Sequence, residues 1–358
     1  MNGLSNSMKL YDLPEYQSTL KKSIPSILSV KELRNRSILI TGATGLIGSS
    51  IVEQLLYLND TQGFAIRIYA GARNVKSLEN RFGQREDIQF VSYDAVKPIA
   101  FAIDIDYLIH AASNASPELY VQQPVETMTS NFLGMYHLLE YAREHQVKRV
   151  VYISSSEVYG QKENDQPFME DEYGFMDILN VRSSYGSAKR ATETLCSSYA
   201  YEYDLDVMIV RPGHIYGPSA KRTDNRISST FVYQAISGQD LIMKSEGSQL
   251  RSYCYHLDCS SAILTVLLTG ERGQSYNISN PKSIISIRQM AALIAQIADV
   301  NLRFDLPKES DLKQANPMEN ASLNSSLLES LGWSGIFDAQ TGFEHTINIV
   351  RELVKNDK

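Results

Sequence analysis

Tyr185 and Lys189 are the residues of this sequence best suited to acid–base chemistry, because they lie four positions apart in the segment YGSAK. That spacing places both side chains on one face of a helix. A tyrosine phenol has a reference pKa near ~10, and a neighbouring ammonium group favours its phenolate form. The pair predicts a general base, although YxxxK by itself also occurs as a surface pair on ordinary helices.

A serine-rich segment, Ser154-Ser155-Ser156-Glu157, follows an apolar stretch typical of a buried strand. The Ser155 hydroxyl is suited to orient a substrate hydroxyl next to the phenol. We therefore predict a catalytic group that contains Ser155, Ser156, Glu157, Tyr185 and Lys189.

Gly42, Gly45 and Gly48 lie directly between a predicted strand and a predicted helix, in the segment GATGLIG. Glycine allows a tight turn, lets backbone N–H groups approach a pyrophosphate, and leaves the positive end of the helix dipole facing that anion. The spacing GxxGxxG is weak evidence alone, and a plain strand-to-helix turn would also produce it. Its strand–turn–helix context favours a dinucleotide site.

The end of the second predicted strand bears on which dinucleotide is bound. NAD sites usually place an acidic residue there, whereas this chain has Arg73, which is suited to a 2′-phosphate, to stacking on adenine or to solvent. Asp94 is placed to meet the adenine edge, or to form a turn. We expect NAD, and NADP remains open. The predicted cofactor contacts are Gly42, Gly45, Leu46, Ile47, Gly48, Arg73, Asp94, Ala111, Tyr185 and Lys189.

Short apolar runs alternate with helical patterns from residue 37 onward, which predicts an α/β fold with a doubly wound parallel sheet. The predicted strands are residues 37–41, 66–70, 88–93, 107–110, 149–154 and 206–211, and the predicted helices are residues 49–58, 124–144 and 185–203. The carboxyl ends of such strands meet at the ligand-binding edge of the sheet. Ser155 and Tyr185 are therefore expected to lie together.

The pattern divides the chain into three parts. Residues 1–34 form an arm with an amphipathic stretch around residues 20–33, which we expect to pack on the main body. Residues 35–217 form the dinucleotide-binding domain, and residues 218–358 form mainly a smaller substrate-binding lobe. Residues 274–278 read as an isolated strand, and at least one segment of the lobe is a candidate to return to the main sheet.

Composition excludes several classes of protein. With 358 residues, 43% of them hydrophobic, the chain can bury a sizeable core. A net charge of −7 argues against a nucleic-acid surface, and no apolar run is long enough for a membrane span. The three cysteines lack metal-ligand spacing, and the chain begins without a secretory pattern, so we expect reduced thiols, no metal site and a cytoplasmic protein.

The combined motifs resemble the extended short-chain dehydrogenase/reductases of the NAD-dependent epimerase/dehydratase family, which modify nucleotide sugars. The resemblance covers about residues 37–351 and rests on TGATGLIGSS, HAASNASP, ISSSEVYG, YGSAKRATETL and VRPGHIYGP. It implies a homodimer built from helices 124–144 and 185–203. It also implies a transient 4-keto sugar, with the hydride returned so that the cofactor is recycled.

Three reactions of this family compete. Plain 4-epimerases usually lack a carboxylate at the position of Glu157, and 4,6-dehydratases carry an aspartic acid at the position of Ser156. UDP-glucuronate decarboxylases typically read Thr-Ser-Glu, which Ser155-Ser156-Glu157 nearly matches. The resemblance is therefore closest to UDP-glucuronate decarboxylases, and the 4,6-dehydratase and the 4-epimerase remain alternatives.

The resemblance also implies a set of substrate contacts. Arg182, three residues before Tyr185, matches an arginine of the decarboxylases, and Arg251 matches an arginine near their substrate. A guanidinium group suits a carboxylate or a diphosphate equally well. His214 replaces a usual asparagine. The predicted substrate-binding residues are Arg182, His214, Arg226 and Arg251.

A different class of function is a dinucleotide-sensing regulator or scaffold that has kept the fold and lost catalysis. The presence of Ser155, Tyr185 and Lys189 argues against it. Turnover of a nucleotide sugar by the purified protein would separate the two classes.

Overall fold

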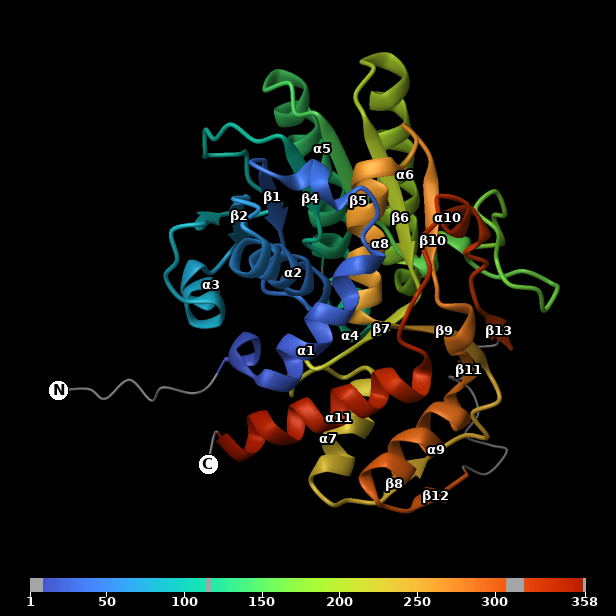
Figure 1. Ribbon diagram of the computed structural model, residues 1–358. Coiled ribbons are helices and arrows are strands. Elements are labelled where there is room, and N and C mark those ends of the chain that lie inside the picture. The colour runs from blue at the N-terminus through green and yellow to red at the C-terminus, as the bar shows by residue number, and fades with distance from the viewer. Residues whose placement is uncertain (1–8, 114–116, 307–318, 357–358) are drawn as a thin grey trace.

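A seven-stranded parallel sheet forms the centre of the computed structural model, which describes residues 9–113, 117–306 and 319–356 (Figure 1). The strand order is β10-β6-β5-β4-β1-β2-β3. The strands are β1 (Ser37–Thr41), β2 (Arg67–Ala72), β3 (Ile88–Ser92), β4 (Tyr107–His110), β5 (Arg149–Ile153), β6 (Val207–Pro212) and β10 (Ser275–Ile278). The doubly wound α/β prediction is confirmed, and the six predicted strands of the main sheet are present within two residues of their predicted bounds.

Helices cover both faces of this sheet, which explains why its inner strands are almost continuously apolar. Helices α2 (Leu46–Gln62) and α8 (His256–Thr269) pack on one face. Helices α5 (Pro124–Glu144) and α6 (Ser184–Glu202) pack on the other, where they bury a separate apolar cluster. Within the described residues, no helix is both long and apolar enough to cross a membrane.

The smaller lobe lies beside the carboxyl end of the sheet (Figure 1). Strand β9 (Leu250–Tyr255) pairs with every other strand of a four-stranded sheet. These strands are β11 (Ile284–Ser286), β13 (Asn320–Ala321) and β7 (His214–Tyr216). A second small sheet pairs β8 (Leu241–Met243) with β12 (Leu302–Phe304). Helices α7 (Ile227–Ile236), α9 (Ile287–Ala298), α10 (Ser326–Ser330) and α11 (Ala339–Asn356) complete the later part of the chain.

The chain crosses between the two parts more than once. Strand β10 returns from the later part of the chain and pairs in parallel with β6, as the sequence indicated for at least one segment. Helix α8 also packs against β5 and β6. The two regions share one apolar cluster, which holds the lobe against the main sheet and its helices.

The amino-terminal arm packs on the main body, but its helix lies earlier than the predicted amphipathic stretch 20–33. Helix α1 spans Pro14–Ser23, and short 3₁₀ turns follow it. Pro25 supplies no backbone N–H for the next i→i−4 hydrogen bond, so the α-helix ends there and continues as a 3₁₀ turn. The Tyr16 hydroxyl donates a buried 2.6 Å hydrogen bond to Glu53 on α2, which fixes the arm to the main body.

Candidate active site

The glycine-rich turn leaves no room for side chains. Gly42 has φ +70°, and a Cβ there would lie 2.6 Å from the backbone of Ala111. A Cβ on Gly48 would collide with the carbonyl oxygen of Gly42. Helix α2 begins at Leu46, directly after this turn, with Ile47 in its first turn. The turn and the helix N-terminus therefore fit the pyrophosphate of a dinucleotide.

The neighbouring strand ends carry no carboxylate suited to ribose at the position usual for NAD. Arg73 is exposed after β2, and Asn74 uses its side chain to accept from the Ser77 N–H at the start of α3 (Val75–Phe82). Asp94 accepts from the Val96 N–H at 3.3 Å, which matches the turn interpretation of this residue. The cofactor roles of Arg73 and Asp94 stay predictions.

Tyr185 and Lys189 lie in the first turns of α6, and both side chains are buried. The Lys189 ammonium donates a 2.8 Å hydrogen bond to the carbonyl oxygen of Ile153, at the end of β5. It lies 5.6 Å from the centre of the Tyr185 ring. The YxxxK motif is thus held at the carboxyl edge of the sheet, next to the segment after β5 that carries Ser155.

Burial changes the protonation of both groups. It raises the pKa of Tyr185 to about 12, while the hydroxyl groups of Ser155 and Ser113 act in the opposite direction. Burial also lowers the pKa of Lys189 to about 7. In this state the phenol is protonated at neutral pH, and groups that stabilise its phenolate form are required before it can act as a base.

The segment after β5 brings a carboxylate to the same place. Ser155 precedes the 3₁₀ turn η4 (Ser156–Tyr159), and its side chain accepts from the Glu157 N–H at 3.2 Å. The Glu157 carboxylate pairs with the Arg182 guanidinium at 3.5 Å, and both side chains are nearly half exposed. The predicted catalytic residues Ser155, Glu157, Tyr185 and Lys189 therefore form one cluster, with Ser156 in the adjoining turn.

The predicted substrate-binding residues include three arginines, two of which pair with carboxylates. Arg251 lies on β9, next to β7, which carries His214. Arg251 is buried, and Glu157 is close enough to act on its charge. Arg226 is held by a hydrogen-bonded ion pair with Asp224. His214 is exposed to solvent at this site, and its partial desolvation, together with the charges of Arg251 and Arg226, lowers the pKa of its imidazole.

Two residues at this site were missed in the sequence. Ser113 follows β4, and its hydroxyl donates at 2.9 Å to Asn131 on α5. Tyr120 lies on the short helix α4 (Pro117–Gln122) and stacks on Tyr185. Neither residue has a diagnostic spacing relative to the other site residues. Ser113 falls within the HAASNASP segment, of which residues 114–116 lie outside the described residues.

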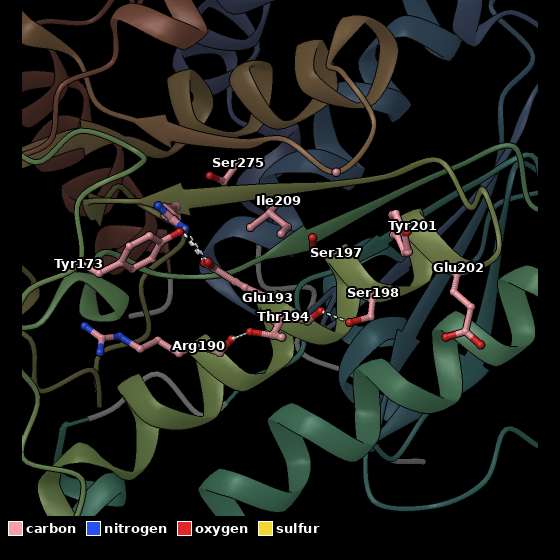
Figure 2. A pocket seen from close by; sticks show the side chains of 12 residues that line it. Tyr173, Arg190, Glu193, Thr194, Ser197, Ser198, Tyr201, Glu202, Ile209 and Ser275 are labelled. Atoms are coloured by element: carbon pink, nitrogen blue, oxygen red, sulfur yellow. Dashed lines mark hydrogen bonds and ion pairs between the residues drawn. The ribbon is translucent and has the colours of Figure 1, made fainter.

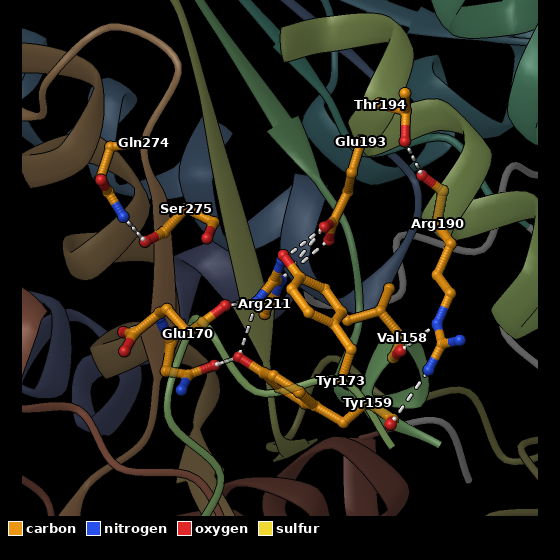
Figure 3. A network of polar contacts seen from close by, with 11 residues as sticks. Val158, Tyr159, Glu170, Tyr173, Arg190, Glu193, Thr194, Arg211, Gln274 and Ser275 are labelled. Atoms are coloured by element: carbon orange, nitrogen blue, oxygen red, sulfur yellow. Dashed lines mark hydrogen bonds and ion pairs between the residues drawn. The ribbon is translucent and has the colours of Figure 1, made fainter. Parts of the chain in front are cut away.

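A buried network behind the site fixes the loop that leads to α6 (Figure 3). The Arg211 guanidinium, on β6, bonds the Glu193 carboxylate at 2.6 and 3.0 Å. It also donates to the hydroxyl of Tyr159 at 2.9 Å and to that of Tyr173 at 3.1 Å. Its last bond, at 2.7 Å, is to the carbonyl oxygen of Glu170. This arginine therefore connects β6, α6 and residues 159–173.

Replacement of Arg211 by methionine is expected to lower the free energy of unfolding by about 3–5 kcal/mol, because it leaves the Glu193 carboxylate buried without its cation. Adding Glu193→Gln should restore part of the loss. Arg272→Met, at an exposed ion pair with Asp204, is the matched control and should cost less than about 1 kcal/mol. Equal losses in urea unfolding for the two arginine variants would contradict the structural role of Arg211.

A groove with a volume of about 920 Å³ runs along the outer side of α6, next to the edge strand β10 (Figure 2). Tyr173 lies at one end and Tyr201 near the other, with Glu193 between them. None of the predicted site residues lines it. The catalytic edge is therefore identified by its side-chain geometry and not by the size of this groove.

Comparison with known proteins agrees with this geometry. Residues 38–279 match the profile of the NAD dependent epimerase/dehydratase family. UDP-glucuronic acid decarboxylase 1 of Xenopus tropicalis is 27% identical, over 95% of this chain and 78% of that protein. UDP-glucuronic acid decarboxylase 6 of Arabidopsis thaliana is 29% identical, over 84% of each chain.

Two solved structures show the same fold. The UDP-glucose 4-epimerase of Thermotoga maritima has a TM-score of 0.74 at 21% identity, over 89% of this chain and 99% of its own. A dTDP-glucose 4,6-dehydratase of Bacillus anthracis, solved with NAD, has a TM-score of 0.72 at 19% identity, over 88% and 97%. The family profile covers more than half of the sequence, and the chain belongs to the NAD-dependent epimerase/dehydratase family.

Proposed function

We propose that the protein uses bound NAD to modify a nucleotide sugar and that its substrate is UDP-glucuronate, which it decarboxylates. The observation that carries the proposal is the pairing of Glu157 with Arg182, beside Tyr185 and within the electrostatic reach of Arg251. A base, a carboxylate and two guanidinium groups then surround one substrate position. The curated relatives described above, which are UDP-glucuronic acid decarboxylases, support this choice.

NAD, when bound, supplies reversible acceptance of the hydride from sugar carbon 4. Tyr185 takes the proton of the 4-hydroxyl while Ser155 orients that hydroxyl. Formation of the phenolate favours the charged ammonium form of the neighbouring Lys189, which burial alone disfavours, and that charge in turn stabilises the phenolate. The resulting ketone withdraws electrons, so that the carboxylate at carbon 5 leaves as carbon dioxide.

The remaining residues act on the substrate's charges. Arg182 and Arg251 hold the departing carboxylate or the diphosphate, and Arg226 and His214 line the nucleotide side. Glu157 and Ser156 assist the transfer of the proton that carbon 5 gains after carbon dioxide has left. In this proposal the lobe of residues 218–358 mainly binds substrate, and residues 35–217 mainly bind NAD.

Product analysis tests the proposal. Incubation with a panel of UDP-, dTDP-, CDP- and GDP-sugars, followed by mass spectrometry, should yield carbon dioxide and a UDP-pentose from UDP-glucuronate alone. A 4-keto-6-deoxy sugar formed from dTDP- or UDP-glucose would favour the 4,6-dehydratase instead, and simple inversion at carbon 4 would favour the epimerase. Dinucleotide binding without turnover of any sugar would favour a regulator or scaffold.

We also propose a homodimer formed through α5 and α6. The outer face of α5 exposes an apolar stripe that includes Val125, Met128, Phe132 and Tyr136. Such a stripe on a helix favours a protein interface. Tyr199 on α6 is buried and donates to Glu140 on α5 within the same chain, so it connects the two helices of one protomer.

The free, buried cysteines support a reducing, cytoplasmic location.

The double variant Met128→Asp/Phe132→Asp is expected to yield monomers, because two charges in the stripe would have to be desolvated on association. Light scattering at micromolar concentration measures the mass. As a matched control, Ile242→Asp/Phe304→Asp places two charges at exposed sites of the smaller lobe and should leave the dimer intact. A monomeric unmodified protein would refute the proposed assembly.

A further inference from the structure

Tyr120 is packed against the proposed base from one side. Its side chain is 3% exposed, and its ring is almost parallel to that of Tyr185, with centroids 4.3 Å apart and an interplanar angle of 5°. The Arg182 guanidinium lies 5.1 Å from the centre of the Tyr120 ring. Tyr120 therefore contacts both the base and the arginine that pairs with Glu157.

The backbone of Tyr120 is also tied to the catalytic helix. The Ser184 hydroxyl donates a buried 3.2 Å hydrogen bond to the carbonyl oxygen of Tyr120. Ser184 immediately precedes Tyr185 at the start of α6. The position of the Tyr120 ring is thus set relative to the phenol that it covers.

The contact between the two rings is a stacking contact over their faces, at a separation that leaves no space between them. Both residues are buried, so neither ring can turn away without displacing the other. The Tyr120 ring therefore restricts the orientation of the Tyr185 phenol at the start of α6.

We propose that Tyr120 is a positioning residue for the Tyr185 base: its ring, tied to the start of α6 by the Ser184 hydrogen bond, fixes the orientation of the phenol by stacking. The inference rests on the proposed function, because it requires Tyr185 to act as the base. It adds to that function a residue that acts through Tyr185 and not on the sugar.

The variant Tyr120→Leu removes the stacked ring and should lower kcat by about 2–10-fold, because the phenol loses the contact that orients it. The substrate KM should change little. Tyr120→Phe keeps the stacked ring and should retain nearly the full kcat.

Tyr201→Leu is the matched control, because this ring is 92% exposed on the same helix as Tyr185, and its loss should leave kcat unchanged. An unchanged kcat in Tyr120→Leu, or an effect on KM alone, would overturn the inference while the base assignment stands. Full turnover in Tyr185→Phe would instead overturn the proposed function itself. The two failures are therefore distinguishable.

Discussion

Replacement of Tyr185 by phenylalanine is expected to reduce turnover by about 10²–10⁴-fold, because it removes the general base and keeps the ring. The phenylalanine ring can still stack on Tyr120 and lie against the Lys189 ammonium. Folding and cofactor retention should therefore change little. Steady-state kinetics on the preferred nucleotide sugar measures the loss of turnover. Thermal unfolding measures the stability of the variant, and chromatography of the released cofactor measures how much cofactor it retains.

The outcome separates a chemical from a structural role for Tyr185. A large drop in kcat with an unchanged melting temperature supports the base. Near-normal turnover would exclude the mechanism proposed for this site. If the variant also loses bound NAD, Ser155→Ala provides a second measurement, because it leaves the predicted cofactor contacts in place and removes the hydroxyl that orients the substrate.

Truncation of Arg251 to alanine is expected to have the second-largest effect. Each charge-assisted hydrogen bond contributes on the order of 1.5–3 kcal/mol, so the loss of a two-bond contact should lower kcat/KM by about 10²-fold or more. Arg251→Lys keeps the charge and loses the planar fork, so its effect should be smaller. Arg288→Ala, at an exposed arginine of the same lobe, is the matched control and should leave turnover unchanged.

The kinetic pattern of the Arg251 variants identifies its ligand. A diphosphate contact would raise KM alike for every nucleotide sugar that the protein accepts. A carboxylate contact would act mainly on kcat, and only with uronates. Unchanged kinetics with every substrate would contradict the placement of Arg251 at the substrate.

The local motifs were readable in the sequence because they depend on neighbouring residues. The strand–glycine–helix segment at Gly42 and the helical spacing of Tyr185 and Lys189 are set by short-range geometry. Both segments follow strands of one parallel sheet. Because the carboxyl ends of parallel strands lie at the same edge, the glycine turn and the Tyr185–Lys189 pair meet there. The prediction for the amino-terminal arm did not take Pro25 into account. Pro25 ends the arm's helix at Ser23, before most of the stretch that was expected to be amphipathic.

Periodicity and short-range spacing were sufficient to predict the fold class, the glycine-rich turn and the shared helix face of Tyr185 and Lys189, since each depends on residues close together in the chain. The surroundings of Tyr185 and Lys189 follow instead from tertiary packing. Tyr120 meets Tyr185 across 65 positions of sequence, and β10 joins β6 across a long excursion through the lobe. The pairing of Glu157 with Arg182 likewise depends on how the loop between them folds back. Such contacts are fixed by packing of distant segments, and no local spacing records them.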